Sequence, residues 1–222
     1  MLEKKLGIST GKGKAILLIA ALIASGFGVA AKAVVITSGQ TLSVSGEAAP
    51  AFASNALLYD SGEVPFNGLD ASSDVVFSGD LDSKVYTDPS TGYLDFVYLF
   101  SNDSDSQDSI LTFSASFFSG YTTDADYITG TGTAPATVER NTQNAGGTLN
   151  YSFPDGVAPN SDAAELIIKT NSPNYSLTGL ASLQDGGNVT ITAPGPVPEP
   201  ATFAITGFAL LALGSRRRSS RR

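Results

Sequence analysis

Residues 93–100, which read YLDFVYLF, decide the fold of this chain. Successive side chains of a β-strand point to opposite faces, so one face of this stretch gathers Leu94, Phe96, Tyr98 and Phe100. Val97 and Leu99 make the opposite face apolar as well. A strand with two apolar faces is typical of the middle of a sheet that is covered on both sides. The stretch therefore predicts a central strand of a β-rich domain.

The segment that follows predicts a partner for this strand. In residues 110–118, apolar side chains alternate with Thr and Ser, which is the pattern of a strand with one wet face. The connection, residues 101–109, is polar throughout. We expect the two strands to form a hairpin with a protruding loop.

Most of the chain between residues 34 and 192 has the same character. Further strands are expected at 34–37, 41–44, 56–59, 74–77, 84–87, 121–128, 148–153, 165–169, 175–180 and 189–192. We expect a turn at Gly79-Asp80 and a long loop over 129–147, while 163–169 could instead form a short helical turn. Short strands divided by turn residues favour an all-β, single-domain antiparallel β-sandwich or jelly roll over 34–192.

The composition excludes several classes of chemistry. The 222 residues include no cysteine and no histidine, so disulfides, thiol chemistry and histidine-based catalysis or zinc binding are not available. Residues 34–196 carry three basic and nineteen acidic side chains, a net charge of −16 against −8 for the whole chain. Such a body repels nucleic acid. We therefore expect a non-enzymatic protein with no required cofactor and no nucleic-acid partner.

The first 33 residues predict a secretory signal peptide. Four lysines precede an apolar run at 15–24, and Ala31 and Ala33 satisfy the small-residue rule for signal peptidase. We expect cleavage after Ala33, which makes the rest of the chain exported. An uncleaved N-terminal anchor is the alternative, although the apolar run is short for a membrane span.

The last 30 residues predict a membrane anchor. A Pro-rich spacer at 193–200 leads into an apolar run at 201–213, and a tail at 215–222 follows with Arg216, Arg217, Arg218, Arg221 and Arg222. The 18 residues from Val197 to Gly214 would reach roughly 27 Å as a helix, just enough for a span. We expect a single transmembrane helix at 201–214. The arginines favour the cytoplasmic side and place the β domain outside the inner membrane.

Val197, Pro198, Glu199 and Pro200, followed by a short apolar segment and an arginine cluster, closely resemble the PEP-CTERM sorting domain of Gram-negative bacteria. The resemblance covers about 26 of the 222 residues. It implies that a membrane transpeptidase, the exosortase, recognises the motif and removes the helix. It also implies a cell-surface or extracellular destination, often beside exopolysaccharide in a biofilm. An ordinary single-span anchor is the alternative.

Two binding functions stay open for the β domain. Asp103, Asp105 and Asp108 lie in one polar loop and could ligate Ca²⁺, although the glycine and glutamate of an EF-hand loop are missing. The pairs Asp80/Asp82 and Asp124/Asp126 are weaker versions of the same pattern, and ordinary solvated turns are the alternative. A lectin-like module would use exposed aromatic rings, such as Tyr93, Tyr121, Tyr127 and Tyr175, to stack on sugars. A hydrolase built on two carboxylates is a further alternative.

Overall fold

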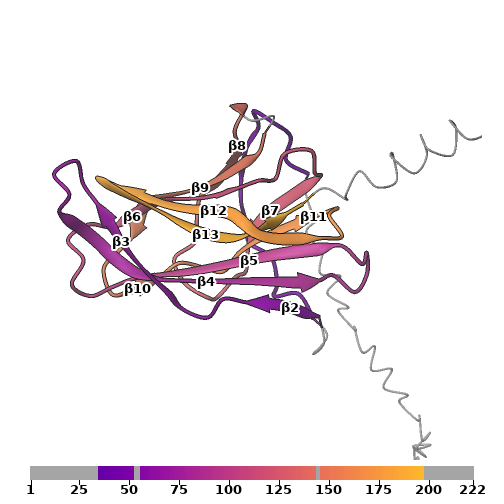
Figure 1. The fold of residues 1–222 in the computed structure, drawn as a ribbon, viewed down its shortest axis with the longest axis horizontal. Helices are drawn as coiled ribbons and strands as arrows, with labels where there is room; N and C mark the ends of the chain where they lie inside the picture. Colours follow the sequence, from indigo (N-terminus) through magenta and orange to yellow (C-terminus); the bar gives the residue numbers. More distant parts are fainter. Residues whose placement is uncertain (1–34, 53–55, 144–145, 198–222) are drawn as a thin grey trace, which may run out of the picture. The chain divides into compact units, whose positions relative to one another are not determined.

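The computed structural model describes residues 35–52, 56–143 and 146–197, and these form an all-β domain (Figure 1). The strands are β1 (Thr41–Ser43), β2 (Leu57–Asp60), β3 (Val64–Leu69), β4 (Val75–Thr87), β5 (Leu94–Asn102), β6 (Ile110–Ser116), β7 (Thr123–Tyr127), β8 (Thr137–Arg140), β9 (Thr148–Val157), β10 (Ser161–Asp162), β11 (Leu166–Thr170), β12 (Tyr175–Asp185) and β13 (Gly187–Pro196). Within the described ranges, no helix has the length and hydrophobicity of a membrane span. The predicted signal peptide and transmembrane helix lie outside these residues.

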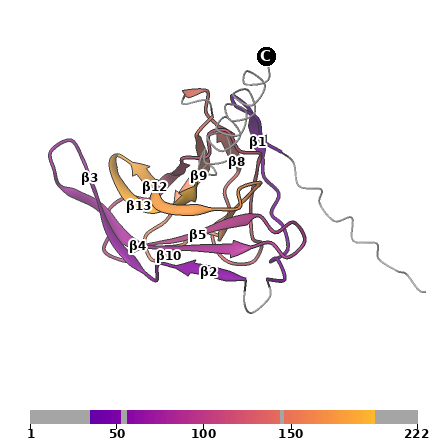
Figure 2. The same ribbon diagram turned by 45° about the vertical axis from the view of Figure 1, so that its right-hand side comes forward.

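The strands form one antiparallel sheet that curls on itself. The hydrogen-bonded order is β1-β8-β9-β6-β12-β13-β3-β4-β5-β11-β7, with β2 added to β4 and β10 added to β5. Both ribbon views show β12 and β13 lying between β9 on one side and β5 and β4 on the other (Figures 1 and 2). The all-β antiparallel fold expected from the sequence is confirmed.

The core fills the space inside the curl and is built on aromatic rings. Phe100 of β5 stacks on Phe113 of β6 with ring centroids 5.8 Å apart, and it meets Phe153 of β9 edge-on at 5.7 Å. Phe96 meets Phe118 edge-on at 5.5 Å. These contacts join the two halves of the curled sheet, and each of these rings is almost fully buried.

Strand β5 occupies the central position predicted for residues 93–100. It pairs with β4 on one side and with β11 on the other. Its second face is also covered, because Val97 packs with Ile128 and Ile167 in a smaller cluster beneath Phe52 and Tyr86. The prediction of a strand buried on both faces is confirmed.

The predicted hairpin of residues 93–100 with 110–118 is wrong. Strand β6 pairs with β9 and β12, and it faces β5 across the core instead of lying beside it. The connection does not protrude, because the amides of Gln107 and Asp108 donate to the carbonyl of Val76 in β4. Alternating apolar residues determine which face of a strand is buried, but they do not determine which strands it pairs with.

The turn predicted at Gly79-Asp80 is also wrong. Gly79 lies inside the continuous strand β4, because the carbonyl oxygen of Ser101 comes within 2.0 Å of where its Cβ would stand. A glycine in a strand interior thus marks a close backbone approach here, not a turn. Strand β3 was not expected, since Pro65 and Gly68 weaken its strand pattern.

The remaining differences concern loops and boundaries. The predicted loop at 129–147 contains strand β8, and the alternative of a helical turn at 163–169 is wrong because β11 is a strand. Strand β13 continues to Pro196, so the predicted domain boundary at 192 falls four residues early. Residues 193–196 pair with β12 and are buried, and they belong to the sheet instead of the spacer.

Candidate functional site

The chain leaves the sheet at a firmly held point. The hydroxyl of Tyr98, deep in the core, donates to the carbonyl of Pro194 at 2.7 Å. Pro196 pairs with Tyr175 at the start of β12, and the amide of Val197 donates to the carbonyl of Asn174 at 3.2 Å. The last strand is therefore anchored up to the first residue of the predicted sorting motif.

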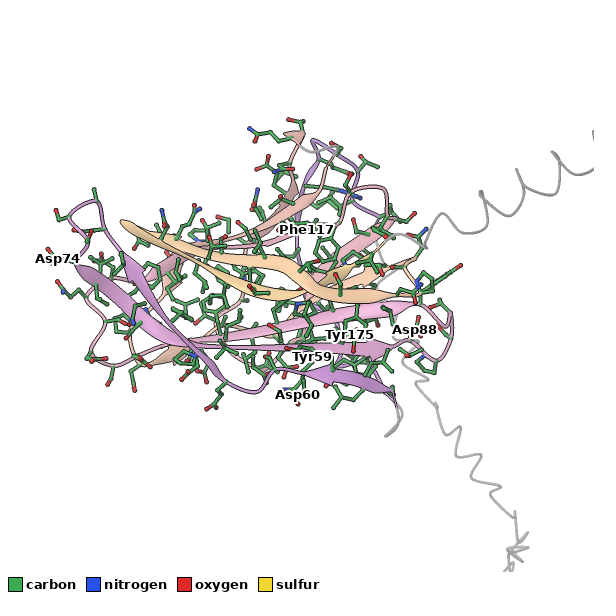
Figure 3. The ribbon with its side chains drawn as sticks, in the orientation of Figure 1. Tyr59, Asp60, Asp74, Asp88, Phe117 and Tyr175 are labelled. Atoms are coloured by element: carbon green, nitrogen blue, oxygen red, sulfur yellow. The ribbon has the colours of Figure 1, made fainter. Side chains whose placement is uncertain are left out.

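Exposed leucines and two half-buried tyrosines lie beside this exit point. The Tyr175 hydroxyl donates to the carbonyl of Leu58 at 3.2 Å, and the Tyr175 ring lies 6.1 Å from that of Tyr59. Figure 3 shows these two tyrosines next to each other. Leu57, Leu58 and Leu177 are between 43% and 48% exposed. We name Leu57, Leu58, Tyr59, Tyr175 and Leu177 the exit patch.

Of the predicted sorting and processing residues, the structure describes only Val197. Pro198, Glu199, Pro200, the five tail arginines, and Ala31 and Ala33 lie outside the described residues. At the N-terminal end of the described chain, Val35 bridges to Asp124 and the Ile36 amide donates to the carbonyl of Thr123 at 2.9 Å. The described sheet thus begins two residues after the predicted signal-peptidase site.

The predicted calcium loop is folded down on β4. A carboxylate oxygen of Asp103 accepts a hydrogen bond from the Ser78 hydroxyl at 2.8 Å, and the Asp103 amide donates to the carbonyl of Ser78. Among the described residues, no group of three or more His, Cys, Asp or Glu side chains is arranged to hold a metal ion. Asp103, Asp105 and Asp108 are therefore not gathered into one ligand set.

The fold adds two carboxylates, Glu63 and Asp162, to the predicted pair Asp80/Asp82, and the sequence did not connect them with this pair. Glu63, Asp80, Asp82 and Asp162 line a hollow of about 150 Å³ together with Leu99 and Ser101. Asp82 forms an ion pair with Lys84. These residues come from β4, β10 and the segment before β3, so only the strand pairing could have brought them together.

Asp95 is the buried carboxyl group of the domain, with 3% of its surface exposed. Burial raises its pKa to about 7, the negative charge of Asp88 adds to the increase, and the positive charge of Lys169 opposes it. Lys169 lies opposite Asp95 on β11 and is ion-paired with Glu47. The burial of Asp95 could have been predicted from the sequence, since this acidic residue interrupts a strand that is apolar on both faces.

Arg140 is the buried cation of the domain, with 6% of its surface exposed. All five N–H bonds of its guanidinium are used. They reach the carbonyls of Ile36, Phe118, Tyr121 and Gly146 and the hydroxyl of Thr123, at 2.7–3.0 Å. Arg140 therefore ties the start of the domain to two turns and to strand β7, a structural role that the predicted loop at 129–147 did not reveal.

An apolar hollow lies beside Phe117, just after β6. Its volume is about 430 Å³, and Phe117 and Leu180 line it with Ser116, Ser119, Gly147 and Thr148. Phe117 is 50% exposed and has a φ of +80°, a strained conformation for a bulky residue. This backbone conformation turns the Phe117 side chain outward, while the side chain of Phe118 lies in the core.

The tyrosines proposed for sugar stacking differ in exposure. Tyr93 is exposed, whereas Tyr121, Tyr127 and Tyr175 are half-buried.

We compared the chain with protein-family models, curated proteins and solved structures. No protein-family model matches the chain, and neither a curated protein nor a solved structure matches it.

Proposed function

We propose that this chain is an exported, non-enzymatic surface or matrix protein that a PEP-CTERM-type pathway sorts. Signal peptidase releases residues 1–33, and residues 201–214 then hold the protein at the inner membrane with the arginine tail inside. An exosortase-like transpeptidase acts at Val197–Pro200 and delivers the β domain to the cell surface, where it joins exopolysaccharide. We also propose that the curled sheet is a jelly-roll-like sandwich, since its two halves pack aromatic faces across one core.

One observation supports this proposal above the others. The described sheet runs from the bridge at Val35 to the hydrogen bond at Val197. Removal of residues 1–33 and of everything after Pro200 would therefore leave every strand and the Arg140 contacts complete. The two expected cuts flank the folded domain without entering it, which is what a processed and released product requires.

The sorting motif can be tested by substitution in the native cells. Replacing Pro198, Glu199 and Pro200 by alanine removes the extended, helix-blocking segment and its carboxylate. We expect the wild-type protein in the surface or medium fraction and at least tenfold more of the variant in the inner membrane, measured by fractionation and immunoblotting. Glu139→Ala, which removes an exposed glutamate of β8, is the control. Equal distribution of the triple variant and the wild type would contradict the proposal.

A second candidate function, a lectin-like module, is favoured by the hollow beside Phe117. An outward aromatic ring provides a face on which the C–H groups of a sugar can pack. Ser119 and Thr148 at the same hollow offer hydroxyl groups that can donate to and accept from a saccharide, and Ser116, whose hydroxyl donates to the Leu180 carbonyl, can still accept. The net charge of −16 disfavours a polyanionic ligand, so we propose a neutral polysaccharide.

Phe117→Ala tests this candidate with exopolysaccharide purified from the native cells as the probe. We expect the fraction of protein that co-sediments with the polysaccharide to fall at least fivefold, because the stacking face is lost. Leu111→Ala removes an exposed side chain from the other end of the same strand and should leave binding unchanged. Unchanged binding by Phe117→Ala would exclude the hollow as the site.

A further inference from the structure

The exit patch lies a short chain distance from the predicted membrane span. Val197 is fixed to the carbonyl of Asn174, and four peptide units separate it from Ala201, where the apolar run begins. A fully extended chain covers at most about 3.6 Å per residue, so this distance is no more than about 14 Å. With the apolar run in a bilayer, the end of β13 must therefore lie close to the lipid headgroups.

The exit patch lies beside this end of the sheet, on β12 and β2. Tyr175 pairs with Pro196, the Tyr175 hydroxyl reaches the Leu58 carbonyl, and Tyr59 contacts the Tyr175 ring. Leu177 follows in a bulge of β12. The chain thus brings three exposed leucines and two tyrosines to the side that the anchor holds nearest to the membrane.

The chemistry of the exit patch suits the interfacial region of a bilayer. Tyrosine is enriched at this depth because its ring is apolar and its hydroxyl is polar, and exposed leucines gain free energy from contact with acyl chains. Asp60 follows the patch in β2, and Asp88 lies in the hairpin between β4 and β5 (Figure 3). These carboxylates favour a zwitterionic lipid surface over an anionic one.

We propose that, while the anchor is in place, the exit patch rests in the headgroup region of the outer leaflet of the inner membrane. This inference rests on the proposed function, since it requires residues 201–214 to span the membrane. The contact holds the β domain in one orientation and keeps residues 198–200 at the lipid surface, within reach of a membrane-embedded transpeptidase.

Single-cysteine spin labels can measure this contact, because the chain has no native cysteine. The full chain is reconstituted in phosphatidylcholine vesicles with a label at Leu58→Cys or Leu177→Cys. Leu111→Cys and Val75→Cys, exposed positions at the other end of the sheet, are the matched controls. Oxygen gathers in lipid and a nickel chelate stays in water, so the ratio of the two collision rates reports depth. We expect this ratio to be at least threefold higher at the two patch positions than at the controls.

A fifth label, at Ala209→Cys in the predicted span, separates the two proposals. A lipid-embedded label at 209 together with water-exposed labels at 58 and 177 would overturn the docking of the exit patch and leave the anchor intact. A water-exposed label at 209 would overturn the anchor itself. Spin–spin broadening at 58 and 177, with the same broadening in vesicles and in detergent, would instead identify a second copy of the chain as the occupant and overturn the lipid contact.

Discussion

Arg140→Lys is expected to destabilise the domain by about 3–5 kcal/mol, the largest effect of any single substitution proposed here. The guanidinium makes five hydrogen bonds in a fixed planar fork, whereas a lysine ammonium has three donors on one atom. At least two of the five acceptors at this buried site would lose their donor, and each such loss costs about 1–3 kcal/mol. Urea denaturation followed by tyrosine fluorescence or circular dichroism measures the loss.

Lys84→Met is the matched control for Arg140. It removes another of the three basic residues of the body, but Lys84 is partly exposed and its ion pair is with Asp82, which is also partly exposed. Partly exposed ion pairs contribute about 0–1 kcal/mol, so the expected loss is small. If Arg140→Lys does not fold, no denaturation curve can be measured. The yield of soluble protein, compared with that of Lys84→Met, is then the readout. Similar losses below 1 kcal/mol for both variants would show that Arg140 does not hold the domain together.

Asp95→Asn is expected to stabilise the domain at pH 8 by roughly 2–4 kcal/mol and to leave it nearly unchanged at pH 4. Burial raises the pKa of Asp95 to about 7 from its ordinary value of 3.8. Between these two values the folded protein binds more protons than the unfolded chain. The contribution of Asp95 to stability is therefore full below about pH 4 and falls as the pH rises through 7. Asparagine resembles the neutral acid and does not titrate.

The measurement for Asp95 is the free energy of unfolding from pH 4 to pH 8 for both proteins. The difference between variant and wild type should grow between about pH 4 and pH 7 and level off above pH 7. Asp105→Asn is the control, because Asp105 is exposed in the loop after β5, and its effect should stay within about 0.5 kcal/mol. Parallel stability curves for Asp95→Asn and the wild type would contradict the burial of an ionisable group at this position.

The fold was predictable where side-chain alternation determines burial. The central strand at 93–100 and the strands at 110–118 and 148–153 were correct because apolar residues recur at every second position. Pairing was not predictable, because Phe100 and Phe113 meet equally well across a core and along a hairpin. Gly79 and residues 193–196 were misread because glycine and proline weaken strand patterns, and only the approach of neighbouring backbone explains their place in the sheet.

Some candidate sites could be predicted from the sequence and others could not. The sorting motif is a continuous stretch and can be read directly from the sequence. The Phe117 hollow, the exit patch and the carboxylates at Glu63, Asp80, Asp82 and Asp162 each combine residues from separate strands. Arg140 was visible as a rare basic residue in an acidic body, but three of its four carbonyl partners lie 19 to 104 residues away and only the fold assembles them.

Sorting by a transpeptidase is tested most directly by the C-terminus of the mature protein from its native cells, determined by intact mass and C-terminal peptide analysis. We expect a chain that begins at Val34 and ends within residues 197–200, and mass beyond that peptide would identify the group joined to it. A mature chain that still carries residues 201–222 would contradict sorting by a transpeptidase and would leave a plain membrane-anchored β domain.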